Sequence, residues 1–453
     1  MLSELRQKKI AVLGFGVEGK TAIGYLSRHG IKPVLFDQSP ANNFSAADRQ
    51  FIKQRCEAAV FGKQAFSRLR GFEIIFKSPG IPPRELKRLP KTAKLTSQTA
   101  EFLKTFSQRT IGVTGTKGKG TTSTLIYEML KADGRPAYLT GNIGKLQAFE
   151  IYDKLKADDW VVFELSSFQL REVTASPHIA VVLMTTSEHL NWHRGRRDYW
   201  QSKTGITRFQ LKKDFAVVNR DYPGSKAVGR LGRGQKSYIS RFGGVPQGCC
   251  VLNGKIVLKK GEKILPLIPV SELGLIGEHN WENACAASEA AHLAGCGLAA
   301  IKKVLRQFRG LEHRLEFAGQ KAGIKYYNDS FSTIPETTMA AIQAFREPVV
   351  LLLGGSGKNS DFRPLARMLA EQNNLRKAVV FGSEAPRILA ALRHARVPAG
   401  KVVAGGKTFS AVFRQARSAA KKGDVVLLSP ACASFDMFKN YKQRGETFKR
   451  LVK

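Results

Sequence analysis

Short apolar runs alternate with longer segments of helical character along most of the chain. Runs at 9–15, 33–38, 74–76, 159–165 and 179–184 are bounded by glycine, proline, asparagine, aspartate or other polar residues. Such runs are typical of buried strands, and strands that alternate with helices favour a largely parallel sheet. The pattern therefore predicts an α/β protein.

The later part of the chain returns to this alternation after a different stretch. Residues 214–275 read as shorter strands and turns. Helices are expected from about Asn280, in an alanine-rich stretch, and over 298–308. Further strands, separated by helices, are predicted at 324–328, 349–353, 378–381 and 425–428.

The stretch 110–131 combines a strand, a glycine-bearing loop and the start of a helix. The strand is 110–114, and the helix is expected from Thr121 to about Lys131. Backbone amides at a helix N-terminus bind anions, and glycine lets the backbone approach a phosphate closely. Lys119 would reach the outer phosphates of a nucleoside triphosphate, and Thr121 would meet Mg²⁺. The expected phosphate-binding residues are Gly115, Thr116, Lys117, Gly118, Lys119, Gly120, Thr121 and Thr122.

This loop departs from the standard P-loop pattern at two positions. Val113 stands where that pattern has glycine, and Gly120 stands where Ser or Thr directly follows the lysine. The metal-facing hydroxyl is therefore expected one residue later, at Thr121. An ordinary glycine-rich turn is the alternative, but the apolar strand before the loop and the helix after it favour the nucleotide site.

The N-terminal strand, at 9–15, leads into a second glycine motif. Gly14, Gly16 and Gly19 have the spacing of a dinucleotide fingerprint, and Asp37 ends the next strand. Alone, this motif is weak support for a redox cofactor. It indicates that a phosphate or ribose binds at the carboxyl end of the strand, with Ser78 at the same edge of the sheet.

Four further residues of the middle segment are of types that can carry chemistry. Glu164 ends a buried strand and is suited to hold magnesium, although a surface glutamate is the alternative. His189 and His193 lie four residues apart, but no third zinc ligand is evident, so one histidine facing the magnesium is the preferred interpretation. Lys203 is expected on a helix, where a solvated lysine is the default.

Length and these motifs together predict three domains. At ~150 residues per domain, the 453 residues accommodate an N-terminal Rossmann-like domain at 1–106 and a central P-loop ATPase α/β domain at 107–310. A C-terminal Rossmann-like α/β domain follows at 311–453. Its strand ends carry polar loops, which are expected to line one face.

The formal net charge of +37 is the unusual feature of the composition. A basic surface binds nucleic acid through its phosphates, but lysine and arginine are spread along the whole chain, with no dense basic tail. We therefore expect a generally basic surface and small anionic substrates, rather than nucleic-acid binding.

Other bulk features indicate a globular cytoplasmic protein. Hydrophobic residues make up 43% and charged residues 24% of the chain, which is ordinary for a globular protein. No apolar run approaches the ~20 residues of a membrane span, and the N-terminus lacks the features of a signal peptide. Six cysteines form no CxxC pair, so free thiols in a reducing compartment are expected.

Taken together, these stretches resemble the Mur ligases, the ATP-dependent enzymes that add amino acids to the peptidoglycan precursor. The branch that joins glutamate to UDP-N-acetylmuramoyl-L-alanine is the most similar. The resemblance covers essentially the whole chain and rests on VTGTKGKGTTS, GNIG, FELSSFQL, SEHLNWH, the helical Lys203, GEHNWENACAA, FRGLEHRLE, YNDS, LLLGGSGK and LLSPACASFDMFKNYKQRGETF.

The resemblance implies a three-domain monomer for the UDP part of the substrate, for ATP and for the amino acid. In this family, ATP phosphorylates the precursor carboxylate, and the amine of the amino acid attacks the acyl phosphate through a tetrahedral intermediate. Catalysis is then mostly positioning and charge neutralisation.

The resemblance also implies a role for each matching residue. Lys119, Glu164, His189 and Lys203 match catalytic positions, with Lys203 carbamylated, and the metal ligands are Thr121, Glu164, His189 and Lys203. Besides the phosphate loop, ATP contacts Asn280, Arg314 and Asp329. The uridine pocket matches Gly14, Phe15, Gly16, Val17, Glu18, Asp37, Gln38 and Ser78; the muramoyl-alanine contacts match Asn142, Ser166 and Gln169; and the glutamate pocket matches Thr333, Lys358, Ser434 and Tyr441.

Two departures from the family pattern keep alternatives open. Gly120 follows the loop lysine, as in folylpolyglutamate synthetases, which however lack the N-terminal α/β domain. Phe331 replaces a lysine after the NDS motif, which leaves D- and L-glutamate as alternative substrates. A non-enzymatic nucleic-acid-binding protein would explain the charge alone, but not the ordered motifs.

Overall fold

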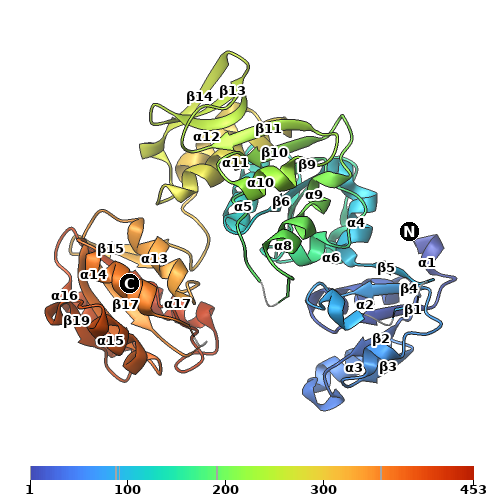
Figure 1. Cartoon of the computed structure of the whole chain (residues 1–453), viewed down its shortest axis with the longest axis horizontal. Helices are drawn as coiled ribbons and strands as arrows, with labels where there is room; N and C mark the ends of the chain where they lie inside the picture. Colours follow the sequence, from blue (N-terminus) through green and yellow to red (C-terminus); the bar gives the residue numbers. More distant parts are fainter. Residues whose placement is uncertain (1, 87–88, 91, 190–191, 358–359) are drawn as a thin grey trace. The chain divides into compact units, whose positions relative to one another are not determined.

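The computed structural model describes residues 2–86, 89–90, 92–189, 192–357 and 360–453. These described residues form three β-sheets with helices packed on their faces (Figure 1). The predicted α/β class is therefore confirmed. Contacts divide the chain into two compact units, which are residues 1–272 with 281–306 and residues 273–280 with 307–453. This division into two units does not test the three predicted domain boundaries, which remain a prediction.

The N-terminal sheet is parallel throughout, with strand order β3-β2-β1-β4-β5. Its central strand is fully buried, which explains its uninterrupted apolar sequence. Because β1 lies between β2 and β4, the loops after these strands meet at one edge. The elements are β1 (Ile10–Leu13), α2 (Val17–Arg28), β2 (Val34–Asp37), α3 (Ala46–Arg55), β3 (Ala58–Phe61), β4 (Ile74–Lys77), β5 (Lys94–Thr96) and α4 (Gln98–Phe106).

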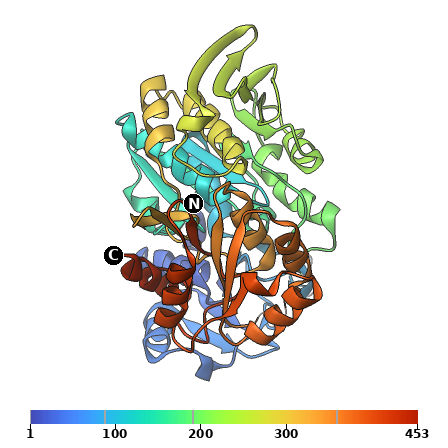
Figure 2. The same cartoon turned by 90° about the vertical axis from the view of Figure 1, so that its left-hand side faces the viewer.

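The second sheet has the order β14-β13-β12-β11-β10-β9-β6-β8-β7 and is parallel from β7 to β12. Its last strands are antiparallel, and the β13–β14 hairpin projects beyond the helices of this sheet (Figures 1 and 2). The strands are β6 (Thr110–Thr114), β7 (Ala137–Gly141), β8 (Trp160–Glu164), β9 (Ile179–Val182), β10 (Phe215–Asn219), β11 (Gln235–Ser240), β12 (Gln247–Leu252), β13 (Lys255–Lys260) and β14 (Lys263–Pro269).

Helices cover this second sheet and connect it to the first. Phe149 of α6 packs on Tyr25 of α2, with ring centroids 4.5 Å apart, and belongs to the core of the N-terminal sheet. The two sheets therefore share one compact unit. The helices are α5 (Lys119–Ala132), α6 (Ala148–Ile151), α7 (Ser167–Leu170), α8 (Arg196–Lys203), α9 (Gly205–Arg208), α10 (Pro223–Gly229), α11 (His279–Leu293) and α12 (Leu298–Gln307).

The third sheet has the order β15-β16-β20-β17-β18-β19 and is parallel except for β15. Helices α13 to α15 pack on one face, and α16 and α17 pack on the other (Figure 2). The elements are β15 (Glu316–Lys321), β16 (Ile324–Asn328), α13 (Pro335–Gln343), β17 (Val349–Gly354), α14 (Arg363–Glu371), β18 (Leu375–Phe381), α15 (Ala385–His394), β19 (Val402–Ala404), α16 (Phe409–Ala419), β20 (Val425–Leu428) and α17 (Tyr441–Val452).

Two predictions about the chain as a whole have direct counterparts here. All six cysteines of the chain are free and buried, as the sequence predicts. In the part of the chain that the structure describes, no helix is long and apolar enough to cross a bilayer.

Candidate active site

The phosphate loop joins β6 to α5, and its backbone requires glycine. Gly118 is left-handed (φ +86°) and is the N-cap of α5, which begins at Lys119 rather than at the predicted Thr121. A Cβ at Gly118 would lie 2.2 Å from Oδ1 of Asn283. The side chain of Lys119 folds over the loop, where Nζ donates to the carbonyls of Gly115 (3.0 Å) and Thr116 (3.1 Å). The turn therefore presents amides and a cation at a helix N-terminus.

Two threonine hydroxyls hold this loop in place. Thr116 Oγ1 accepts from the Thr186 amide (3.0 Å) and lies 3.1 Å from the Tyr199 hydroxyl. Thr122 Oγ1 donates to Oδ1 of Asn283 on α11 (3.2 Å). Because Thr122 has this partner, Thr121 stays the candidate for a metal-facing hydroxyl. Asn283 was missed by the sequence analysis, which selected Asn280 from the same motif.

Lys203 of α8 lies directly beneath the phosphate loop. Its residue is only 1% exposed, and Nζ donates to Thr114 Oγ1 (3.2 Å) and to the carbonyl of Gly115 (3.1 Å). Burial, and then the charge of Lys119, hold the pKa of Lys203 well below its ordinary value. A lowered pKa favours the unprotonated amine, which is the nucleophilic form of a lysine.

Carboxylates and a histidine lie close to these lysines. Glu164 is buried at the end of β8, and its charge acts on Lys203. Glu188, also missed by the sequence analysis, pairs with Lys117 (2.8 Å). Burial, followed by the nearby lysines, lowers the pKa of His189, although Glu188 opposes this. His189 is therefore neutral at pH 7 and able to act as a metal ligand.

His193 does not join His189 in a zinc site. Its Nε2 lies 3.0 Å from Ser167 Oγ, and its Nδ1 lies 3.4 Å from a carboxylate oxygen of Asp198. The described residues contain no group of three His, Cys, Asp or Glu side chains suited to a metal. Magnesium usually takes one or two carboxylates together with substrate phosphates and water, and the oxygens of Glu164 and Thr121 beside the loop fit that donor set.

One cavity of about 630 Å³ brings together ten of the predicted residues of the first compact unit. Its volume is sufficient for a substantial part of a nucleotide-sugar substrate. The predicted residues that line it are Gly16, Val17, Glu18 and Ser78 from the N-terminal sheet and Lys119, Asn142, Ser166, Gln169, His189 and Lys203 from the second sheet.

A hydrogen-bonded chain crosses this cavity from one sheet to the other. Gln169 Nε2 donates to Glu18 Oε1 (2.7 Å), and Gln169 Oε1 accepts from the Ser166 amide (2.8 Å) and hydroxyl (2.9 Å). Glu18 Oε2 is buried and has no protein partner. Burial raises the pKa of Glu18 to about 7, against the effects of Gln169 and Lys77.

The remaining N-terminal residues shape the loop at the edge of the sheet. The carboxylate of Asp37 accepts from the amides of Phe15 (2.7 Å) and Ser39 (2.8 Å). Gly14 is left-handed (φ +83°), and its carbonyl accepts from the Ser78 hydroxyl (3.0 Å). The side-chain amide of Gln38 donates to the carboxylate of Glu85 (3.3 Å). Asp37 thus holds the glycine loop directly, a role that the dinucleotide pattern did not indicate.

Three other predicted residues, Asp329, Thr333 and Ser434, lie in the second compact unit, in the loops after β16 and β20. Asp329 accepts from the Leu315 amide (3.2 Å) and from the Ser429 hydroxyl (2.7 Å). Burial raises its pKa to about 6, although hydrogen bonds act in the opposite direction. Thr333 continues the same loop, and the buried Ser434 follows β20.

Phe331 connects two predicted sites of this unit. The guanidinium of Arg314 lies over its ring, at 4.5 Å, and the Tyr441 ring meets it edge-on at 5.1 Å. Asn280, at the start of α11, donates to the Ile276 carbonyl (2.7 Å). The predicted Lys358 lies outside the described residues.

Comparisons with known families match two parts of the chain. Residues 113–291 match the Mur ligase middle domain, and residues 313–432 match the Mur ligase glutamate ligase domain. These matches contain the phosphate loop and most of the loops of the third sheet.

Comparisons with whole proteins agree with these matches. UDP-N-acetylmuramoylalanine–D-glutamate ligase of Symbiobacterium thermophilum is 36% identical over 455 residues, which cover 98% of each chain. The enzyme of the same name from Acetivibrio thermocellus is 34% identical over 456 residues, covering 99% of this chain and 97% of the relative.

Solved structures share the fold at lower identity. The MurF structure from Acinetobacter baumannii has a TM-score of 0.60 and 18% identity, covering 100% of this chain and 98% of that one. A MurF ligase from Thermotoga maritima in complex with ADP has a TM-score of 0.59 and 17% identity, covering 93% and 95%. With two family domains matched and about a third of the residues shared over the whole length of such ligases, this chain belongs to the Mur ligase family.

Proposed function

We propose that this protein is an ATP-dependent ligase that joins D-glutamate to UDP-N-acetylmuramoyl-L-alanine and releases ADP and phosphate. One geometric observation carries the proposal: Lys119 of the phosphate loop, the buried Lys203 and His189 line the same cavity as Asn142, Ser166 and the N-terminal glycine loop. A carboxylate bound in this cavity would therefore lie beside the phosphate-binding residues. The names of the full-length relatives support the choice of substrates.

The chemistry requires the substrate carboxylate to become an acyl phosphate, a mixed anhydride in which phosphate is the leaving group. The substrate carboxylate attacks the γ-phosphorus of ATP, and the bond to the β-phosphate oxygen breaks, which releases ADP. Lys119 and the amides of the loop at the start of α5 neutralise charge on the phosphates. Magnesium held by Glu164, His189 and Thr121 would supply further positive charge to the same oxygens.

The second step forms the amide bond. The amine of glutamate attacks the acyl carbon, the tetrahedral intermediate collapses, and inorganic phosphate leaves while the amine loses a proton. Holding the two reactants together accounts for much of such a rate enhancement. The loops that carry Thr333, Ser434 and Tyr441 are proposed to bind the amino acid, with Asn280, Arg314 and Asp329 on the nucleotide.

Lys203 is proposed to be carbamylated. Its neutral amine would add to carbon dioxide, forming an N–C bond and releasing one proton, which leaves a carbamate anion. That anion supplies oxygen ligands that an ammonium cannot offer. Burial and the low pKa support this modification, because only the unprotonated amine reacts. The enzyme is further proposed to act as a monomer in the cytoplasm.

Phe331 keeps L-glutamate as the second candidate substrate. It takes the place of a family lysine, and Arg314 and Tyr441 pack on its ring, so a cation is replaced by an aromatic surface near the proposed amino-acid pocket. A folate substrate is less well supported, because the N-terminal loop residues Gly16, Glu18 and Ser78 line the proposed substrate cavity.

The test is a phosphate-release assay with UDP-N-acetylmuramoyl-L-alanine and ATP, run separately with D- and L-glutamate. We expect turnover with D-glutamate and its loss in Lys119→Ala. Lys131→Ala is the matched control, because it removes an exposed lysine from the far end of the same helix. Full turnover by Lys119→Ala, or no turnover with either enantiomer, would contradict the proposal.

A further inference from the structure

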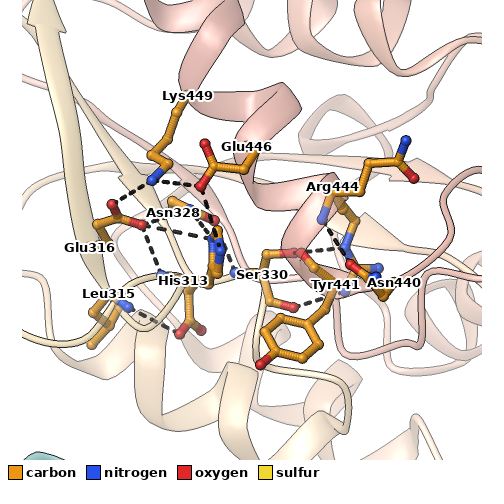
Figure 3. A network of polar contacts seen from close by, with 12 residues as sticks. His313, Leu315, Glu316, Asn328, Ser330, Asn440, Tyr441, Arg444, Glu446 and Lys449 are labelled. Carbon is orange, nitrogen blue, oxygen red and sulfur yellow. Dashed lines mark hydrogen bonds and ion pairs between the residues drawn. The ribbon is translucent and has the colours of Figure 1, made fainter. Parts of the chain in front are cut away.

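Arg444 of α17 is the largest fully buried side chain of the second compact unit among the described residues. Its guanidinium makes four hydrogen bonds to neutral oxygens, and those to Ser330 can be followed in Figure 3. Nε donates to Ser330 Oγ (3.0 Å), Nη1 donates to the Ala433 carbonyl (3.0 Å), and Nη2 donates to the carbonyls of Ser330 (2.9 Å) and Cys432 (3.1 Å). Four of the five guanidinium protons are thereby used.

These contacts join segments that are distant in the sequence. Ser330 belongs to the loop after β16, whereas Cys432 and Ala433 belong to the loop after β20. Ala433 also pairs with Ser356 of the loop after β17 through two backbone hydrogen bonds (2.9 and 3.1 Å). One side chain therefore bonds two strand-end loops directly and a third through Ala433.

The start of α17 is fixed by the same group. Ser330 Oγ accepts from Arg444 and donates to the carbonyl of Tyr441 (2.8 Å). Beside Arg444, a Cβ at Gly445 would lie 2.2 Å from Nδ1 of His313. The helix can pack this closely only because a glycine stands there, and this closeness brings Arg444 within reach of the loops.

The tethered loops are those that carry the proposed substrate contacts. Asp329 directly precedes Ser330, and Ser434 directly follows Ala433. The carbonyl of Tyr441 accepts a hydrogen bond from the Ser330 hydroxyl. We propose that Arg444 is a positioning residue, which sets the loops after β16 and β20 so that Asp329, Ser434 and Tyr441 face the nucleotide and the amino acid. This inference rests on the proposed function.

An ion pair on the same helix provides the contrast. Lys449 bonds Glu316 and Glu446, both at 2.9 Å, at the partly exposed end of the network in Figure 3. Its partners belong to β15 and α17, so Lys449→Met removes a cation from α17 without removing a contact to the loops after β16 and β20. Lys449→Met is therefore the matched control for Arg444→Gln, which also removes a cation from α17.

The experiment measures kcat and the KM of each substrate for Arg444→Lys, Arg444→Gln, Ser330→Ala and Lys449→Met, with folded protein quantified by circular dichroism. We expect KM for glutamate to rise about tenfold or more in Arg444→Gln and less in Arg444→Lys. Ser330→Ala, which removes one of the four acceptors of Arg444, is expected to raise it about threefold. The KM for the UDP-linked substrate, which is proposed to bind in the first unit, and all values for Lys449→Met should stay within about twofold.

Two results would overturn the positioning role. One is a fall in kcat that only follows the folded fraction, with all three KM values unchanged, in the Arg444 variants and in Ser330→Ala. The other is a parallel rise of all three KM values. Turnover by the unmodified enzyme is measured first, so failure of the proposed function would appear as no product with the wild-type chain and is distinct from either result.

Discussion

Lys203 in the first compact unit and Arg444 in the second are buried to the same extent, yet burial affects their charges differently. Lys203 has two hydrogen-bond acceptors, and its pKa falls well below the ordinary value. Arg444 has four, and burial lowers its pKa only to about 10, so it stays charged at pH 7. Burial therefore favours the unprotonated form of the lysine, whereas the arginine remains a cation that organises backbone carbonyls.

The largest expected effect tests whether Lys203 has a chemical role. Lys203→Ala and Lys203→Arg should lower kcat by about a thousandfold, because neither residue can form a carbamate. Short carboxylic acids should restore part of the activity of Lys203→Ala, since their oxygens can replace those of the carbamate. The measurement is phosphate release with and without added acid.

Gln201→Ala, an exposed change on the same helix, is the control for this loss and should keep wild-type kcat. If folded Lys203→Ala keeps most of its activity, or if no acid rescues it, Lys203 does not act as a carbamate.

The second prediction concerns stability rather than rate. Arg444→Met should lower the free energy of unfolding by about 3 kcal/mol, because it leaves buried carbonyls without donors. Lys203→Met should cost less than about 1 kcal/mol, since it removes two hydrogen bonds and also a buried amine. Urea unfolding followed by circular dichroism compares the two. If the two variants lose the same free energy of unfolding, Arg444 and Lys203 do not differ in their contribution to stability, and the comparison fails.

The third prediction extends the comparison to a buried acid. Burial raises the pKa of Glu289 of α11 to about 7, although Ser237 donates to it (2.5 Å). Between the unfolded pKa near 4.5 and pH 7, the unfolded chain binds fewer protons than the folded one, so the stability of the native chain falls as pH rises. Glu289→Gln removes this penalty and should gain up to about 2 kcal/mol at pH 8, and nothing below pH 4.5.

Denaturant unfolding of Glu289→Gln and wild type at pH 4.5, 6 and 8 measures this difference. Glu262→Gln, at an exposed turn, carries the same charge change and should show no such trend. If the difference in unfolding free energy between Glu289→Gln and wild type is the same at every pH, Glu289 does not have a raised pKa in the folded chain.

The smallest expected effect is at Phe331. Phe331→Leu removes the aromatic face beneath Arg314, an interaction of about 0.5–1 kcal/mol at a partly exposed site. The KM for ATP should therefore rise about two- to fivefold, whereas Phe331→Tyr should match wild type. The KM for ATP of both variants is measured by steady-state kinetics at saturating glutamate. An unchanged KM in Phe331→Leu would show that the stacking does not position Arg314.

The sequence predicts most clearly the elements whose signal is local. Strands β17 and β20 are continuous apolar runs because both of their faces are buried. The edge strands β15 and β19 went unpredicted, since they are half exposed and one has only three residues. Local patterns carry no information about where such edges pair.

The same limit applies to the candidate site. The phosphate loop could be found from its glycines and Lys119, whereas Glu188 and Asn283 acquire partners only through contacts with distant residues. Arg444 stands in the charged sequence YKQRGETFKRLV, which is typical of a solvated helix. Its burial depends on the loop of Ser330, 114 positions earlier, together with the loop of Cys432 and Ala433, and no local periodicity encodes that.

The six buried cysteines have a practical consequence for biophysical work. Burial raises the pKa of Cys56 and Cys296 to about 11 and that of Cys432 to about 12, so these thiols react slowly with maleimides. The native cysteines should therefore take up little dye when fluorophores are attached to introduced cysteines. Cysteines introduced at the exposed Asp158 and Arg363, one in each compact unit, would carry a donor and an acceptor dye, and their energy transfer could be compared with and without substrates.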